Sequence, residues 1–173
     1  MEIENLAPDE KSTMVLIYTQ NALFRGEVVT KASARVGVWL RTQGVPNMIH
    51  LLKPSILLFG GSPPKSLSYA EIFVPTVSVI GFHLAPPSND PMDYDENEKN
   101  RSFAPISLLM GTFTVKGSLR ISSMAAISTS LEVAYNGWMS IYNAEISNPF
   151  LAQMQPILVP LLLTSPSRVN FMR

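Results

Sequence analysis

The stretch Leu23-Phe24-Arg25-Gly26-Glu27-Val28 reads like a later one, Thr114-Val115-Lys116-Gly117-Ser118-Leu119. Each is expected to be a strand with a glycine inside it, and such a glycine usually marks a bulge or a sharp bend. Small barrels need this bend because one strand must serve two sides of the barrel. We therefore predict the same bend twice, at Gly26 and at Gly117.

Further matches extend these two stretches into an internal repeat. At the same offset Ser33-Ala34 meets Met124-Ala125 and Leu40-Arg41 meets Leu131-Glu132, and after a slip of one position Ile49, Leu51 and Ile56 meet Met139, Ile141 and Ile146. Each half then has an apolar strand interrupted by proline, Ile72-Phe73-Val74-Pro75 and Ile157-Leu158-Val159-Pro160. A repeat of roughly 70 residues is too long for a solenoid unit and about right for a small barrel.

A short helix is predicted after the second strand of each half. Ser33 is the expected N-cap of a helix at Arg35 to Leu40, and Ser123 is the expected N-cap of one at Met124 to Leu131. Three further strand segments follow each helix, so each unit is read as strand–strand–short helix–strand–strand–strand.

These features resemble a group of small bacterial proteins of unknown function with an Sm-like barrel. The resemblance rests on Phe24-Arg25-Gly26-Glu27-Val28, the helix at Arg35 to Leu40, Phe73-Val74-Pro75-Thr76 and their second-half echoes. It implies a mainly β chain of two tandem Sm-like or SH3-like barrels, each with one short helix. Sm-like proteins typically assemble as rings and bind RNA, and their helix precedes the first strand rather than following the second.

The expected organisation has four parts. Residues 1–12 form a flexible acidic tail, residues 13–85 the first barrel, residues 86–103 an acidic linker and residues 104–173 the second barrel. The linker has little to bury and is read as a solvated flexible segment. The alternative is that its acidic side chains shield a basic face of the folded units.

Composition narrows the class of protein. Of the 173 residues 46% are hydrophobic and 15% are charged, with no net charge and no cysteine, which excludes disulfides and zinc-thiolate sites. The acidic N-terminus lacks the features of a signal peptide, and the longest apolar run near the C-terminus, Ile157 to Leu163, is about a third of a membrane span. We therefore expect a cytoplasmic protein without membrane contacts.

The residues offer little catalytic chemistry. Asp9, Asp90, Asp93 and Asp95 all lie in the tail or the linker, and His50 and His83 lie in predicted strands, where a structural role is the expected one. A Ser-His-Asp triad would need an acid from a flexible segment. Calcium-loop and phosphate-loop patterns are incomplete. No catalytic, cofactor or metal residue is predicted.

Basic side chains give one further hypothesis. Arg25 and Lys116 precede the two bend glycines and should occupy equivalent places, and Arg35 and Arg41 belong to the first helical segment. These four residues are the candidate contacts for RNA or single-stranded nucleic acid. The alternative is that they are ordinary solvated side chains.

The sequence thus favours a non-enzymatic interaction or assembly module whose partner is another protein or a second copy of itself. The alternative function is an Sm-like barrel that binds RNA or single-stranded nucleic acid.

Overall fold

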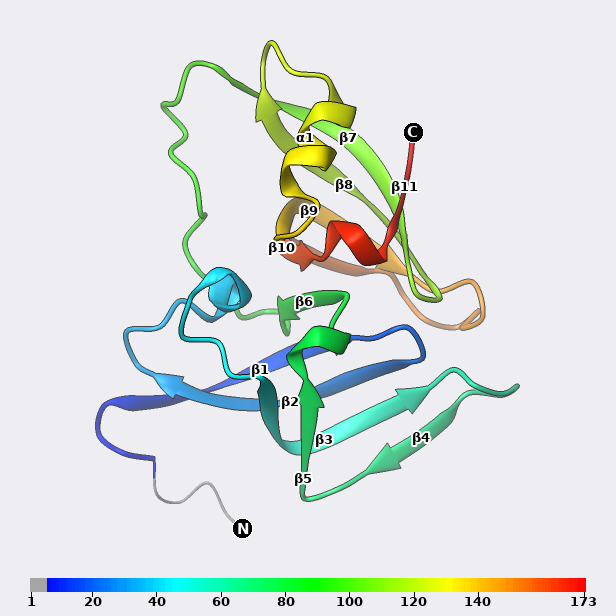
Figure 1. Ribbon diagram of the computed structural model, residues 1–173. Helices are drawn as coiled ribbons and strands as arrows, with labels where there is room; N and C mark the ends of the chain where they lie inside the picture. The colour runs from blue at the N-terminus through cyan, green and yellow to red at the C-terminus, as the bar shows by residue number, and fades with distance from the viewer. Residues whose placement is uncertain (1–5) are drawn as a thin grey trace.

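The computed structural model describes residues 6–173, which form one sheet of eleven antiparallel strands with a few short helices (Figure 1). The chain is therefore mainly β, as predicted. The strands follow the order β11-β7-β8-β9-β10-β6-β1-β2-β3-β4, and β5 also pairs with β3. Residues 1–5 of the predicted tail lie outside the described residues.

The first half supplies six strands and two short 3₁₀ helices. Its elements are β1 (Glu10–Tyr18), β2 (Ala22–Lys31), η1 (Val36–Arg41), β3 (Met48–Leu58), β4 (Lys65–Ser68), β5 (Glu71–Pro75), η2 (Thr76–Ser78) and β6 (Gly81–Leu84). The second half supplies five strands, one α-helix and one 3₁₀ helix. Its elements are β7 (Arg101–Met110), β8 (Phe113–Ser122), α1 (Ile127–Ala134), β9 (Met139–Ser147), β10 (Ile157–Thr164), η3 (Pro166–Arg168) and β11 (Asn170–Met172).

The two halves pair their strands in the same order. In the first half the order is β6-β1-β2-β3-β5, and in the second it is β11-β7-β8-β9-β10. The bend glycines also hold the same place, since Gly26 lies opposite Val15 and Gly117 lies opposite Ile106. The fold around each half is therefore built on one plan.

The predicted bulges at the two glycines are confirmed. The β2–β3 register shifts between Arg25 and Glu27, and the β8–β9 register shifts between Lys116 and Ser118. A Cβ on Gly117 would lie 2.5 Å from the side chain of Ile141. Glycine is thus required because the bulged strand lies against its neighbour too closely for any side chain.

The match between the two proline-interrupted strands is wrong in register. Ile72 of β5 lies opposite Leu51, whose match in the second half is Ile141. If the two strands matched, Ile157 would lie opposite Ile141, but Leu162 lies there instead. Ile157 instead lies opposite Ile146, in the part of β9 that corresponds to the part of β3 paired with β4. One long strand, β10, therefore pairs along almost the whole of β9, whereas two strands, β4 and β5, share the corresponding length of β3. The presence of an apolar run before a proline in both halves does not determine which residues the strand pairs with.

The two halves do not each close into a barrel of their own. Strand β10 of the second half pairs with β6 of the first, with Leu163 opposite Phe82 and Thr164 opposite Gly81, so one open sheet runs through both halves. The outer edge of β10 is used in this joint rather than to close its own half. Figure 1 shows β6 lying between the two sets of strands.

The core has two parts that meet along the joint. Val15 and Ile17 of β1 pack into the cluster formed mostly by the first half, whereas Leu16 and Tyr18 pack into the cluster formed mostly by the second. Because side chains alternate along a strand, β1 contributes to both clusters at once. One strand of the first half therefore takes part in the cores of both halves.

The two predicted helix caps are wrong. The helices begin at Val36 and Ile127, and neither N-cap makes a side-chain hydrogen bond. The serines fall instead in turns that leave the preceding strands, closed by backbone hydrogen bonds from Ala34 to Lys31 and from Ala125 to Ser122. Among the described residues, no helix is both long and apolar enough to cross a membrane.

The boundaries of the predicted parts also shift. Strand β1 begins at Glu10, inside the predicted tail, because Glu10 pairs with Lys31 and Asp9 makes a 2.8 Å ion pair with the same lysine. Strand β7 begins at Arg101, inside the predicted linker. The segment between β6 and β7 passes η1 of the first half and then runs along one side of the second half (Figure 1).

Candidate functional site

The joint between the halves is buried. All four residues of β6 are buried. The Thr164 hydroxyl donates to the carbonyl of Ile80 over 2.9 Å, and the backbone N–H of Ser165 donates to the same carbonyl over 3.1 Å. These bonds attach β10 to the start of β6 and satisfy polar groups that burial would otherwise leave unpaired.

The strands that correspond to this pair are free on their outer sides. Strand β5 corresponds to the end of β10 and pairs only with β3, and β11 corresponds to β6 and pairs only with β7. Within residues 6–173 each therefore has one edge that pairs with no strand. An unpaired edge presents backbone donors and acceptors to any strand that fits it.

The linker attaches to the joint through Asp93. Its carboxylate accepts hydrogen bonds from Tyr142 Oη (2.7 Å) and Ser140 Oγ (2.8 Å) and forms a 2.5 Å ion pair with Arg41 Nη1. Burial alone would raise the pKa of Asp93, but these hydrogen bonds and the Arg41 charge hold that pKa below its ordinary value. Burial and the bond to Asp93 raise the pKa of Tyr142 to about 12. One carboxylate thus binds η1 of the first half to β9 of the second.

A second linker contact forms around Arg120 of β8. Its Nη1 lies 2.7 Å from Glu98, its Nη2 donates to the carbonyl of Asp95, and its guanidinium lies 4.4 Å above the centre of the Tyr94 ring. Glu98 also pairs with Arg101 Nε at 3.3 Å. The hydrogen bonds from Arg120 and Arg101 lower the pKa of Glu98.

The structure divides the four candidate nucleic-acid contacts into two pairs. Arg35 and Arg41 lie at the two ends of η1 and bind the linker, Arg35 through the carbonyls of Pro91 and Met92 and Arg41 through Asp93. Arg25 and Lys116 are exposed on β2 and β8, each just before its bulge. The linker therefore contacts both arginines of the η1 segment and leaves Arg25 and Lys116 exposed.

Sequence reasoning missed the linker residues that make these contacts. Asp93 was placed in a segment with little to bury, yet only 7% of its side chain is exposed. Tyr94 stands among acidic residues and packs edge-on against Tyr142. An aromatic residue inside a charged linker is the one signal that could have indicated docking.

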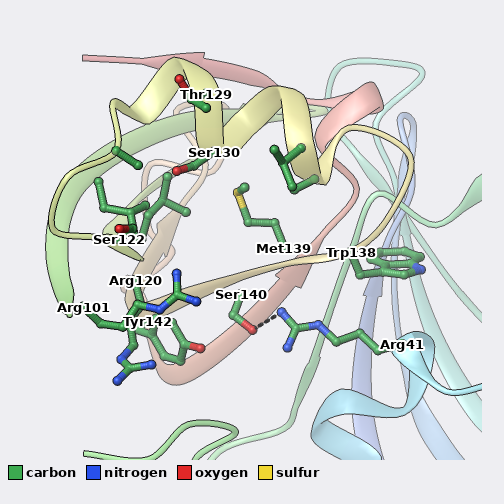
Figure 2. A pocket seen from close by; sticks show the side chains of 15 residues that line it. Arg41, Arg101, Arg120, Ser122, Thr129, Ser130, Trp138, Met139, Ser140 and Tyr142 are labelled. Carbon is green, nitrogen blue, oxygen red and sulfur yellow. Dashed lines mark hydrogen bonds between the residues drawn. The ribbon is translucent and has the colours of Figure 1, made fainter. Parts of the chain in front are cut away.

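A hollow of about 370 Å³ opens beside these contacts, between α1 and strands β8 and β9. Figure 2 shows Met139 and Trp138 on one side, Thr129 and Ser130 of α1 above, and Arg41 reaching in from the first half. Among residues 6–173 its lining carries three arginines and no carboxylate: Arg41, Arg101 and Arg120. The hollow therefore combines an apolar surface with positive charge.

The two histidines occupy different surroundings. His83 is fully buried, its Nδ1 donates to the carbonyl of Leu84 over 2.7 Å, and its Nε2 therefore accepts from Tyr18 Oη over 2.9 Å. Burial lowers the pKa of His83 to about 4, so the ring is neutral at pH 7. His50 is exposed, stacks on Phe73 and pairs with Glu71 at 2.7 Å.

Neither histidine belongs to a metal cluster. Over residues 6–173 no three or more histidine or acidic side chains gather closely enough to hold a metal ion.

No protein-family model, curated protein or solved structure matches this chain.

Proposed function

We propose that the chain is a non-enzymatic assembly module that binds further copies of itself through the edges of its sheet. The observation that carries the proposal is the pairing of β10 with β6, in which the closing strand of one half is added to the edge strand of the other. Adding a strand to a sheet edge is a general mode of protein recognition.

The proposal includes duplication of one small strand unit, of the kind found in small barrels. Its support is the common strand order of the halves, the bulge at Gly26 and at Gly117, and the common place of the following helix. A duplicated unit that binds its own copy within one chain carries the same complementary surfaces at its two outer ends.

The joint inside the chain supplies the register expected between chains. In β5, Phe73 lies opposite His50, which is equivalent to the pair of Leu163 with Ser140 in β10. In β11, Phe171 lies opposite Leu108, which is equivalent to the pair of Phe82 with Ile17 in β6. The internal pair of Leu163 with Phe82 therefore becomes Phe73 of one copy with Phe171 of the next. Such contacts join unlike surfaces, so they give rings or filaments rather than a two-fold dimer.

Exposed apolar side chains lie at both ends of the sheet. Phe73 is 52% exposed on β5, and Met172 and Leu109 are exposed on β11 and β7. Large apolar side chains at an unpaired edge are often covered by a partner, because solvent exposure of such an edge favours association. Pairing of β5 with β11 would cover both groups.

The outer edges lack two hydrogen-bond donors of the internal joint. Pro75 stands where Ser165 donates its N–H, and Val74 stands where Thr164 donates its hydroxyl. A proline on an edge strand weakens strand addition. We therefore expect association between chains to be weaker than the internal joint and to be reversible.

Sedimentation velocity over a wide range of protein concentrations tests the proposal. The wild-type chain should self-associate, the double variant Val74→Thr/Pro75→Ser should associate more tightly, and Phe73→Lys should remain monomeric at higher concentrations. Phe150→Lys is the matched control, because Phe150 is more exposed than Phe73 but lies in the β9–β10 loop rather than in an edge strand. Monomers at every concentration, including for the double variant, would refute the proposal.

Arg25 and Lys116 support a second candidate function, the binding of RNA or single-stranded nucleic acid. They place two exposed positive charges at equivalent bulges. Binding of a single-stranded RNA should then weaken steeply with salt and weaken further in Arg25→Gln/Lys116→Gln. Absence of binding at low salt would remove this candidate.

A further inference from the structure

The hollow between α1 and strands β8 and β9 has the features of a small-molecule site that the assembly proposal does not use. Its surface is mainly apolar, with Leu119 and Ile121 of β8 and Met139 of β9 among its lining residues. Sites for small ligands are typically apolar cavities with a few polar groups that orient the ligand. The volume of about 370 Å³ lies within the usual range for such sites.

The charges around the hollow indicate an anion. Arg41 enters it from the first half and Arg101 and Arg120 from the second, so the three guanidinium groups come from three separate elements (Figure 2). The carboxylates that pair with these arginines, Asp93 and Glu98, belong to the linker and do not line the hollow. An anionic group placed there would form charge-assisted hydrogen bonds.

The chain itself shows which anion these arginines accept. Asp93 pairs with Arg41, and Glu98 pairs with both Arg120 and Arg101, so each guanidinium already holds a carboxylate. Arg101 differs from the others because it uses only its Nε among the hydrogen bonds of residues 6–173. Its two Nη groups remain available, and 43% of its side chain is exposed.

The helix above the hollow is loosely held. No residue of α1 is buried, Val133 is 85% exposed, and only Ile127, Leu131 and Ala134 pack partly against the core. An element with so few buried contacts can shift at low cost to fit an apolar body beneath it.

We propose that this hollow binds a small organic carboxylate with an apolar body. The carboxylate accepts hydrogen bonds from the Nη groups of Arg101, and the apolar body lies under α1 against Met139 and Trp138. This inference is independent of strand-edge assembly, because none of the residues involved belongs to β5 or β11.

Fluorescence and calorimetry with octanoate test the proposal. The chain has two tryptophans, so Trp39→Phe leaves Trp138, which lines the hollow, as the only indole. Octanoate should change the Trp138 emission in a saturable way with one site per chain, whereas neutral 1-octanol should bind about tenfold more weakly because it lacks the charge-assisted bonds.

Three variants in the Trp39→Phe background locate the site. Arg101→Gln should weaken octanoate binding about tenfold, and Ala125→Leu, which fills the hollow without changing its charge, should weaken it by a similar factor. Arg25→Gln removes an exposed arginine outside the hollow and should leave binding unchanged.

Circular dichroism and thermal melts confirm that each variant is folded before it is titrated. Equal binding of octanoate and 1-octanol, or unchanged octanoate binding in Arg101→Gln and Ala125→Leu, would overturn the proposal.

Discussion

Lys53 and Asn143 have nearly the same left-handed backbone, with φ of 47° and 49°. In each half, strand pairing resumes one residue after the bulge glycine: Glu27 lies opposite Leu52, and Ser118 lies opposite Tyr142. Lys53 and Asn143 are the residues that directly follow Leu52 and Tyr142. Both side chains are exposed. The unusual backbone thus recurs at equivalent points of the two halves, because each bulge forces the facing strand to turn there.

Lys53→Asn should stabilise the protein. Asparagine tolerates positive φ better than lysine does, and relief of part of the left-handed strain is worth about 0.5 kcal/mol, whereas Asn143→Ala should cost about 1 kcal/mol. Urea unfolding of both variants measures these changes. The control is Lys65→Asn in β4, where positive φ is absent and asparagine has no such advantage. Equal effects at positions 53 and 65 would contradict the explanation.

Gly117→Ala should destabilise the protein by about 1–3 kcal/mol, the usual cost of overpacking. The added Cβ would lie 2.5 Å from Ile141 Cγ2 and 3.0 Å from the carbonyl oxygen of Tyr142, so β8 and β9 would have to separate. Gly26→Ala should cost less, because its nearest contact is 3.2 Å from the carbonyl oxygen of Leu52. Gly44→Ala is the control, since nothing lies within 4 Å of its Cβ. Thermal melts should rank the three variants in that order.

His83 should make the stability of the protein depend on pH. Burial lowers its pKa from 6.5 to about 4. Below pH 6.5 the unfolded chain binds a proton at this histidine and the folded chain does not, so the free energy of unfolding falls as the pH drops toward 4. The full loss corresponds to about 3 kcal/mol, and the contribution is restored above pH 6.5.

Urea unfolding at pH values from 7.5 to 4 measures this dependence. His83→Gln should be less stable at pH 7 but should lose little further stability between pH 6.5 and 5. Parallel slopes for wild type and His83→Gln would rule out His83 as the cause.

The sequence was informative where a single residue type has a local physical consequence. A glycine inside a strand marks a bulge, so Gly26 and Gly117 predicted the two register shifts. The same reasoning failed for Ser33 and Ser123, because capping competes with a turn that the preceding strand has already begun. Register failed too, since the apolar runs before Pro75 and Pro160 satisfy more than one alignment.

The candidate sites depend on contacts between distant parts of the chain, which sequence patterns do not encode. Nothing around Leu163 and Phe82 indicates that they face each other across the joint. The linker was read mainly from its charge, and a charged segment is usually solvated. The pocket that Tyr142, Ser140 and Arg41 form around Asp93 exists only after both halves have folded.

Asp93→Asn should loosen the linker and weaken the joint. The amide keeps the shape of the side chain but loses the charge that pairs with Arg41 and forces one of its donors toward Tyr142 or Ser140. Breaking a partly exposed ion pair and its hydrogen bonds should cost about 1–3 kcal/mol. Because the Asp93 pKa is lowered in the folded chain, this contribution is present above its ordinary value of 3.8 and is lost as the pH falls below it.

Urea unfolding at pH 7 and limited proteolysis test the role of Asp93 together. Asp93→Asn should be less stable than wild type and should be cleaved faster between β6 and β7, because a released linker reaches a protease more readily. Asp95→Asn is the matched control, since Asp95 is exposed and, among the described residues, its carboxylate bonds only to Asn97 two residues away. If both variants are cleaved at the wild-type rate, the linker is held by contacts other than Asp93, and the Tyr94–Arg120 stack becomes the contact to remove next.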